Sequence, residues 1–502
     1  MKKRTIFPTS KKVQLSIPSF EKGISLKYDK ALTNFNYASS IENFSFDTGA
    51  LTGGIGFDNI FSHIAKPNEA QNLSTDLKNI GDIERIFYFY KYNSTLCQKE
   101  DKLVFVSASH QIYYVDLQKT NKQLSTLRNI KFTSTPDAIR YRLNGEDVLI
   151  FTSETDNMTV WDGTNAPYEV LDAPHISSMA VHFERLFATV DGEKNSIWFS
   201  DELDPTEWSV SLDEAGFIEL VDERGTLNKV VSFNDYIYIF RDYGISRLSA
   251  FGNQTQFSAS NLYVSSGKIY PKSVCVCGDK IIFLSSDGLY KFDGVDTVKI
   301  LENIENGFKN MDNKNAISCF YGSSYFLACN FQNGTEYLDT LLEIDTDNYS
   351  LKSIVKGYDF KFISSIQSET VNGVIAVLKK TKENAFLVGF IVKNGSYFGK
   401  STKKVWKSQT SNIGETFANK VLRSVFVQTD CPVLIKVFDG EKYHSFQFES
   451  SKKLCMKKCI IPLVDFSFEI ECESTSCNIK NLKFEFFTLG REPKWTMEKV
   501  HI

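Results

Sequence analysis

The feature that most constrains the fold of this chain is a sequence pattern that returns at intervals near 45 residues. Residues 273–295, SVCVCGDKIIFLSSDGLYKFDGV, show one unit of it: short apolar runs separated by one Gly-Asp and two Asp-Gly steps. Asp-Gly between apolar runs favours a tight hairpin, because such turns need residues that accept positive φ. The unit therefore predicts a meander of three short strands, over residues 273–277, 280–285 and 289–292.

Seven copies of this unit can be aligned on an apolar residue that stands two positions after a turn residue. Successive copies are 45, 38, 51, 44, 44 and 49 residues apart. A period near 45 with three or four short strands per unit is typical of a β-propeller, whereas an α-solenoid of similar period would show 3.6-residue periodicity. An irregular β-sandwich is the alternative fold for this region. The turn residues that open the seven copies are Asp101, Glu146, Glu184, Asp235, Asp279, Ser323 and Asn372.

The sequence predicts an all-β chain made of three consecutive regions. Residues 81–400 carry the repeats and are expected to form a β-propeller of about seven blades. Residues 1–80 form an irregular, extended clasp region, with a strand-like run at 13–17 and a short helix expected over 67–80. Residues 401–502 change to longer alternating strands with turn signals every eight to twelve residues, which is typical of a compact antiparallel β-sandwich.

The charge balance and the absence of export signals limit the function classes. The formal net charge is −4, so the whole chain lacks the electrostatic signature of a protein that grips nucleic acid. The N-terminus begins basic but is not followed by an apolar segment of signal-peptide length. No stretch approaches the roughly 20 apolar residues of a membrane helix. We therefore expect synthesis in the host cytoplasm and no stable membrane insertion.

The cysteine pattern gives weak support for a metal site. The chain has ten Cys, and the pairs Cys455-x3-Cys459 and Cys472-x4-Cys477 could suggest zinc or a disulfide. Neither pair has Cys-x-x-Cys spacing, and the nearest histidine is His444. Buried, reduced thiols are the preferred interpretation. The sequence thus predicts no metal and no cofactor.

Motifs for catalysis are also missing from the sequence. There is no G-x-S-x-G, no cysteine in a protease-like setting and no H-E-x-x-H, and no Gly-rich loop precedes a helix. Propeller glycosidases use carboxylates at the central channel, but many aspartates here precede glycine in turn positions, which explains them without catalysis. We expect no catalytic residues and no enzymatic activity. The turn aspartates are Asp162, Asp191, Asp287, Asp293 and Asp439.

Tryptophans are the other residues with functional potential, because an exposed indole can stack on a sugar or anchor an interface. Those in repeat strands are expected to pack between blades. Trp208 differs, because Asp204 and Pro205 should place it on a loop, where an interface role is as well supported as packing. The candidate interface residues are Trp208, Asp204, Pro205 and Trp406.

Three separate stretches, in a fixed order, carry a likeness to a known family. The first contains the runs FEKGIS, ASSIENFSFDTGAL and GGIGF, the second is IWFSDELDPTEWS, and the third combines WKS, NKVL and an FDG hairpin. Together they resemble phage and prophage β-propeller tail proteins of the nozzle type, also described as packaged-DNA stabilisation or tail hub proteins. The stretches occupy residues 20–25, 38–51, 53–57, 197–209, 406–408, 419–422 and 438–440.

This resemblance implies a structural virion protein located in the tail. Its copies would form a ring, expected to be a hexamer, between adaptor or portal-side proteins and distal tail proteins, with DNA passing transiently through the channel. A near-neutral or slightly acidic wall suits DNA transit, because a basic wall would bind the phosphates. The main alternative is a carbohydrate-binding propeller that recognises a host receptor, and a propeller glycosidase is the third possibility.

Overall fold

The computed structural model describes residues 10–27, 36–94, 97–210, 215–332, 335, 337–411, 419–463 and 465–489. The chain forms two compact units, each assembled from non-consecutive segments. The propeller unit comprises Phe57–Ser350 and Lys356–Val392, and the sandwich unit comprises Met1–Gly56, Leu351–Val355 and Lys393–Ile502. The three consecutive regions expected from the sequence, 1–80, 81–400 and 401–502, stay a prediction.

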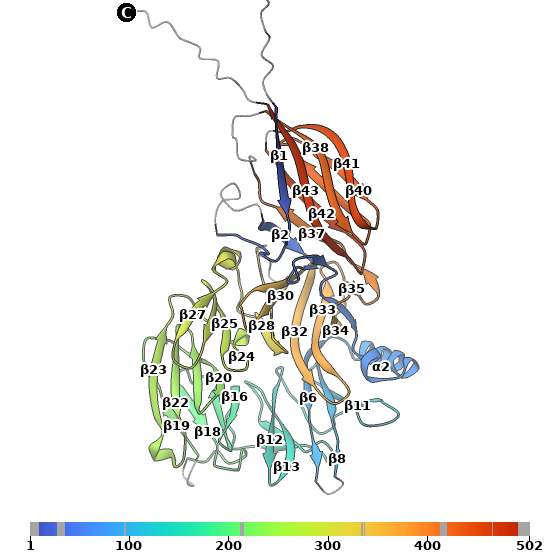
Figure 1. The fold of residues 1–502 in the computed structure, drawn as a ribbon. Coiled ribbons are helices and arrows are strands. Elements are labelled where there is room, and N and C mark those ends of the chain that lie inside the picture. The colour runs from blue at the N-terminus through green and yellow to red at the C-terminus, as the bar shows by residue number, and fades with distance from the viewer. Residues whose placement is uncertain are drawn as a thin grey trace, which may run out of the picture. The chain divides into compact units, whose positions relative to one another are not determined.

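The propeller unit contains a succession of antiparallel sheets, which we number as blades 1 to 7 (Figure 1). In blades 1 to 5 each sheet has four strands in chain order from the inside outward. Blade 1 consists of β6 (Ile83–Phe89), β9 (Lys102–Ser107), β10 (Ile112–Asp116) and β11 (Leu124–Thr126). Blade 2 consists of β12 (Asp137–Leu143), β13 (Glu146–Thr152), β14 (Met158–Trp161) and β15 (Tyr168–Val170). Blade 3 consists of β16 (Ile176–His182), β17 (Arg185–Val190), β18 (Ser196–Phe199) and β19 (Gly216–Glu219).

The remaining blades continue this order. Blade 4 consists of β20 (Leu227–Phe233), β21 (Tyr236–Arg241), β22 (Gly244–Ser249) and β23 (Ser258–Val264). Blade 5 follows a 3₁₀ turn, η2 (Pro271–Ser273), and consists of β24 (Cys275–Val276), β25 (Ile281–Ser285), β26 (Gly288–Phe292) and β27 (Thr297–Ile300). Blade 6 contributes β28 (Ile317–Tyr321), β29 (Ser324–Cys329) and β30 (Thr340–Asp345) to the unit. Blade 7 consists of β32 (Tyr358–Gln367), β33 (Asn372–Lys380) and β34 (Leu387–Val392), beside β5 (Gly56–Asn59).

The blades form a closed ring. The first strands touch in sequence from β6 through β12 and β16 to β20, which contacts η2. The contacts continue from β24 to β28 and on to β32, and β32 returns to β6. Since β5 comes from the N-terminal end of the unit and neighbours β34 of the last blade, the ring is fastened by a strand far away in sequence.

The predicted fold class is confirmed: the chain is all-β, with a seven-bladed propeller and an antiparallel sandwich. Each of the seven turn residues that opened the sequence alignment lies at or just before the start of a blade's second strand, as Asp101 does before β9 and Asn372 does at β33. The repeat was visible because a polar turn followed by an apolar strand recurs at the same place in every blade.

Two helices precede the blades: α1 (Phe61–Ile64) and α2 (Pro67–Asn79). The short helix expected over 67–80 is therefore confirmed as α2, with Pro67 in its first turn, where a missing amide hydrogen is harmless. Ala70, Leu73 and Leu77 are its buried residues. Within the described part of the chain, no helix combines the length and the apolar character needed to cross a membrane.

The sandwich unit contains two antiparallel sheets. One has the order β31-β3-β4-β43-β38-β41, and β1 also pairs with β43; in Figure 1 the blue β1 lies beside the red β43. The other has the order β2-β37-β42-β39-β40. The first sheet contains β1 (Ser10–Ile17), β3 (Phe44–Ser45), β4 (Leu51–Thr52), β31 (Leu351–Lys356), β38 (Asn419–Thr429), β41 (Ser451–Leu463) and β43 (Asn478–Leu489). The second contains β2 (Ala38–Glu42), β37 (Lys404–Ser408), β39 (Val433–Phe438), β40 (Tyr443–Phe448) and β42 (Ser467–Cys472).

Aromatic side chains fill the space between these two sheets. Phe466 and Phe468 lie 5.0 Å and 4.8 Å from the ring of Phe484, measured between centroids. Such edge and tilted contacts add to the hydrophobic gain of burying large rings. The N-terminal strands join this core because the apolar residues of β1 and β2 complete its sheets.

Candidate functional site

A cavity with a volume of about 640 Å³ lies at the axis of the propeller unit. Its walls come from the first residues of the inner strands, such as Asp137 and Lys229, and from the ends of second strands. These segments meet because neighbouring strands of each blade are antiparallel, so the second strand ends where the first begins. The cavity is thus formed where the inner strands of blades 1 to 4 and the turn η2 before blade 5 converge.

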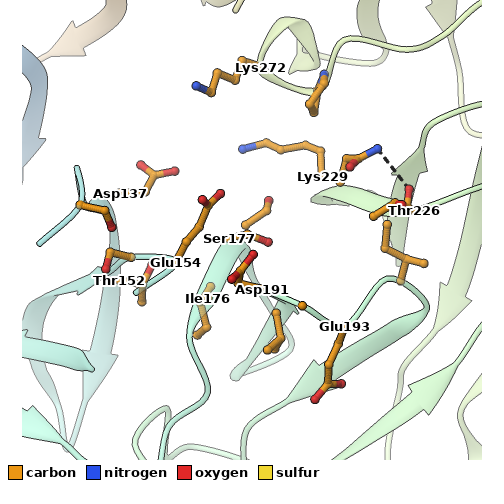
Figure 2. A pocket seen from close by; sticks show the side chains of 18 of the residues that line it. Asp137, Thr152, Glu154, Ile176, Ser177, Asp191, Glu193, Thr226, Lys229 and Lys272 are labelled. Carbon is orange, nitrogen blue, oxygen red and sulfur yellow. Dashed lines mark hydrogen bonds between the residues drawn. The ribbon is translucent and has the colours of Figure 1, made fainter. Parts of the chain in front are cut away.

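Charges of both signs line the cavity in equal number. Figure 2 shows the Lys229 amine and the Glu154 carboxylate extending into the same space. Within the described residues, none of the charged lining side chains has an ion-pair partner within 4.0 Å, although Glu193 accepts a 2.7 Å hydrogen bond from the Trp198 indole. The cationic members are Arg85, Lys194, Lys229 and Lys272, and the anionic members are Asp137, Glu154, Asp191 and Glu193.

Lys272 shows how this setting affects a titratable group. Its side chain is in contact with solvent, yet it stands inside a protein-lined cavity. Desolvation lowers the pKa of its ammonium, and the nearby Arg85 and Lys229 cations lower it further, against the opposing effect of Glu154 and Asp137. The cavity therefore favours a ligand that neutralises positive charge near Lys272.

The lining limits which ligands the cavity suits. It contains hydroxyl, amide and charged side chains but no aromatic ring on which a sugar could stack. Its carboxylates are also too far apart to bind a metal ion together. Among the described residues, no Asp or Glu belongs to a group of three or more potential ligands whose ligand atoms lie within 4.8 Å of one another. The geometry fits a small polar or charged ligand, or water, better than a metal ion.

The structure buries Trp208 inside the propeller unit. Its side chain is 2% exposed and packs in the core shared by blades 2 and 3, against residues such as Met158. Its indole Nε1 donates a 2.9 Å hydrogen bond to the carbonyl of Pro205. Asp204 caps the same turn, because its carboxylate accepts hydrogen bonds from the amide (2.9 Å) and hydroxyl (2.6 Å) of Thr206. The sequence placed Trp208 on a loop, and the loop folds back to bury it.

Trp406 is likewise fully buried, in β37 of the sandwich unit. Phe20 meets its ring edge-on at 5.4 Å between centroids, and Phe468 stacks on it at 5.2 Å. Trp406 thus joins an N-terminal residue to the sandwich core. The interface role of Trp208, Asp204, Pro205 and Trp406 stays a prediction. Because both indoles are buried, neither can contact a partner directly, and each would act by stabilising the residues around it.

Strand β41 is a functional candidate that the sequence did not single out. It is the last strand of its sheet, pairs with β38 on one side, and has no strand on its other side among the described residues. Three large apolar side chains along it are exposed: Leu454 by 52%, Met456 by 48% and Ile460 by 71%. A long edge strand with exposed apolar groups offers unpaired backbone groups to another chain. The lysines of residues 452–458 interrupt the apolar alternation, so the first half of this strand carries no clear strand signal in the sequence.

Comparisons with known proteins add a fold-level likeness only. No family model matches the chain, and no curated protein matches its sequence. Among solved structures, the chain is similar to the β-propeller domain of Cps50 (Swd1) from Myceliophteria thermophila, with 10% identity and a TM-score of 0.40, over 62% of this chain and 97% of that one. It is also similar to BBS1N, solved in complex with ARL6DN, with 10% identity and a TM-score of 0.39, over 63% of this chain and 95% of that one.

Proposed function

We propose that this chain is a non-enzymatic structural protein of a phage tail, of the nozzle or packaged-DNA stabilisation type. In this proposal its copies assemble into a closed ring, a hexamer by family resemblance, that walls part of the DNA channel. Its neighbours are adaptor or portal-side proteins and distal tail proteins. The protein resides in the virion tail.

The observation that carries the assembly proposal is the exposed edge of β41. Its lysines discourage unspecific pairing, so a suitable neighbour should present carboxylates beside an open edge. The chain has such an edge in β40, the last strand of the other sheet, which is flanked by the exposed residues Glu441 and Glu449. Contact between two different surfaces of identical copies is heterologous, and such contacts generate a ring when the rotation closes.

The propeller suits a structural role in this proposal. It is rigid because its ring is closed by a strand from the opposite end of the unit. The net charge of −4 supports DNA transit, since the attraction of cationic walls for phosphates would slow the passage of DNA. We therefore expect no tight, salt-dependent binding of the purified chain to duplex DNA.

The test is to measure the assembly state of the purified full chain and its presence in particles. Light scattering coupled to size exclusion, followed by negative-stain microscopy, should give a ring of several copies at micromolar concentration. Quantitative mass spectrometry of purified virions should find the chain at a fixed number of copies per particle. A chain that stays monomeric at all concentrations and is missing from particles would exclude the proposal.

A carbohydrate-binding propeller that recognises a host receptor is the second candidate. The polar cavity at the propeller axis supports it, because carboxylates such as Asp137 and Glu154 can accept hydrogen bonds from sugar hydroxyls. The lack of an aromatic lining weighs against it. A glycan array with wild-type and a Glu154→Gln variant would decide: specific binding that the variant loses would favour this candidate over the tail ring.

A further inference from the structure

Three cysteines that are distant in sequence converge inside the sandwich unit. The sulfurs of Cys431, Cys472 and Cys477 all lie within 4.8 Å of one another, and the Cys431 and Cys472 sulfurs are 3.6 Å apart. The three residues are only 2–5% exposed. In a tetrahedral zinc site with Zn–S bonds of about 2.3 Å, two sulfurs stand about 3.8 Å apart. The distance between the Cys431 and Cys472 sulfurs is already close to this value.

The three cysteines come from the two connections that join the sheets at one end of the sandwich. Cys431 lies between β38 and β39, while Cys472 ends β42 and Cys477 precedes β43. The Asp430 carboxylate accepts a 2.7 Å hydrogen bond from the amide of Asn478, which ties one connection to the other. The backbone therefore holds the three sulfurs together without any help from a covalent bond.

A buried cation stands beside the cluster. Lys404 is fully buried, and its ammonium donates to the carbonyls of Ser474 (2.7 Å), Thr402 (3.3 Å) and Gly395 (3.4 Å). No carboxylate lies within ion-pair distance of it in the described part of the chain. Lys404 is paired with Cys472 across the neighbouring strands β37 and β42, which places it next to the cluster. A buried ammonium is costly unless negative charge compensates it, and thiolates supply that charge.

We propose that Cys431, Cys472 and Cys477 bind one Zn²⁺ ion as three thiolates, with Lys404 as the neighbouring counter-charge. On binding, the metal forms Zn–S bonds to all three sulfurs, the three thiol protons pass to solvent, and no electron is transferred. Zn²⁺ with three thiolates carries one net negative charge, which the Lys404 ammonium neutralises. The fourth tetrahedral position is left to a non-protein ligand.

This site would link the two sheets of the sandwich at the end where their connections meet. Metal binding to a preformed thiolate set adds its free energy to folding, so the ion would stabilise the sandwich unit. The inference does not depend on the tail-ring proposal, because it rests only on the sandwich residues. Cys431 is 41 residues away from Cys472, so the three cysteines do not have the short spacing of a zinc-binding sequence motif.

The test uses the full chain, purified in a reducing buffer without a metal-affinity tag. Elemental analysis after dialysis against Zn²⁺ should give one zinc per chain, and Co²⁺ in its place should give intense thiolate-to-cobalt absorption. Removal of the metal with a strong chelator should lower Tm, and Zn²⁺ should restore it. Because these measurements use the wild-type chain, they stay valid even when a cysteine variant folds poorly.

Variants then locate the metal. Cys477→Ser should lower Zn²⁺ affinity by at least about 100-fold, and Lys404→Met, which alters only a neighbouring charge, by about 10-fold. Cys459→Ser is the matched control, because Cys459 is a half-buried thiol of the same unit that hydrogen bonds to the Leu422 carbonyl. Less than about a tenth of an equivalent of zinc on the wild-type chain, a Cys431–Cys472 disulfide in its place, or an equal loss in Cys459→Ser would overturn the proposal.

Discussion

The hydroxyl of Tyr325 in blade 6 donates a 2.7 Å hydrogen bond to the carbonyl of Ser273, at the start of blade 5. Both residues are fully buried, and the same carbonyl also accepts a 2.8 Å bond from the hydroxyl of Ser318. This pair of bonds is one of several polar links between neighbouring blades; another is the bond from the Tyr238 hydroxyl of blade 4 to the Gly294 carbonyl of blade 5. Its strength can be measured because either donor can be removed separately.

Tyr325→Phe should lower the free energy of unfolding by about 1 kcal/mol, because the Ser273 carbonyl keeps one donor. The double variant with Ser318→Ala should lose about 1–3 kcal/mol beyond the single change, because the buried carbonyl is then unsatisfied. Denaturant unfolding of all four members of the cycle measures this coupling. Tyr168→Phe, at a half-exposed hydroxyl in blade 2, is the control and should leave the stability unchanged. Simple additivity in the cycle would show that the carbonyl has another partner.

The strand that closes the ring gives a second prediction. Phe57 of β5 is fully buried and lies 5.5 Å from the ring of Tyr358 and 6.0 Å from that of Phe360, between centroids. Phe57→Ala should cost about 3–5 kcal/mol, because it leaves a cavity at the closure. Hydrogen exchange should rise first in β32–β34 of blade 7. Phe251→Ala, at a residue that is 70% exposed, should change stability by less than about 0.5 kcal/mol. Equal protection of every blade in the Phe57 variant would contradict the role of β5 as a fastener.

Local patterns predicted the blades but not the way in which the ring is fastened. A turn residue such as Asp279 and the apolar residues after it lie within one hairpin, so the repeat can be recognised from residues that are consecutive in the sequence. The neighbours β5 (Gly56–Asn59) and β34 (Leu387–Val392) are far apart in the sequence, and no local periodicity encodes such a pairing. The N-terminal strand β1 was expected as a strand, but its pairing with β43 was not.

For the candidate sites as well, local features could be predicted from the sequence, whereas contacts between distant segments could not. Trp208 was expected on a loop because Asp204 and Pro205 favour a turn, yet only the three-dimensional fold shows that the indole turns inward to the core of blades 2 and 3. The axial cavity combines residues from several blades, and its members carry no shared motif. The basic run in residues 452–458 carries no motif of a binding site, and the structure places it in the exposed edge strand β41.

A buried histidine predicts a pH dependence of stability. His182 is 4% exposed, its Nδ1 lies 2.8 Å from the Ser232 hydroxyl, and its Nε2 has no partner among the described residues. Desolvation lowers its pKa below the ordinary value of 6.5, against a smaller opposing effect of Asp235. The unfolded chain therefore binds a proton more readily than the folded one as the pH falls. This contribution to stability is complete above pH 6.5 and is lost below it.

The His182→Gln variant separates this titration from the packing of the side chain. Urea unfolding between about pH 7.5 and pH 5 should show a smaller loss of stability with falling pH than in the wild-type chain, whatever the absolute stability of the variant. His175→Gln is the control, because His175 is exposed. This variant should lose stability with falling pH at the same rate as the wild-type chain. Parallel pH profiles for wild-type and His182→Gln would mean that His182 becomes protonated in the folded protein as easily as in the unfolded chain.

The edge strand β41 gives the prediction that bears most directly on assembly. Ile460→Lys places a charge at a residue that is 71% exposed, so the free energy of unfolding should change by less than about 0.5 kcal/mol. In a contact between copies, the same change replaces a buried apolar side chain with a charge that must be desolvated, and it should weaken the contact by at least about tenfold in Kd. Light scattering across a concentration series should then give a smaller average mass than for wild-type. Val221→Lys, at a propeller residue that is 73% exposed, controls for added charge and should assemble normally. If both variants assemble like wild-type, the copies meet through another surface, and the exposed apolar groups of β41 need a different partner.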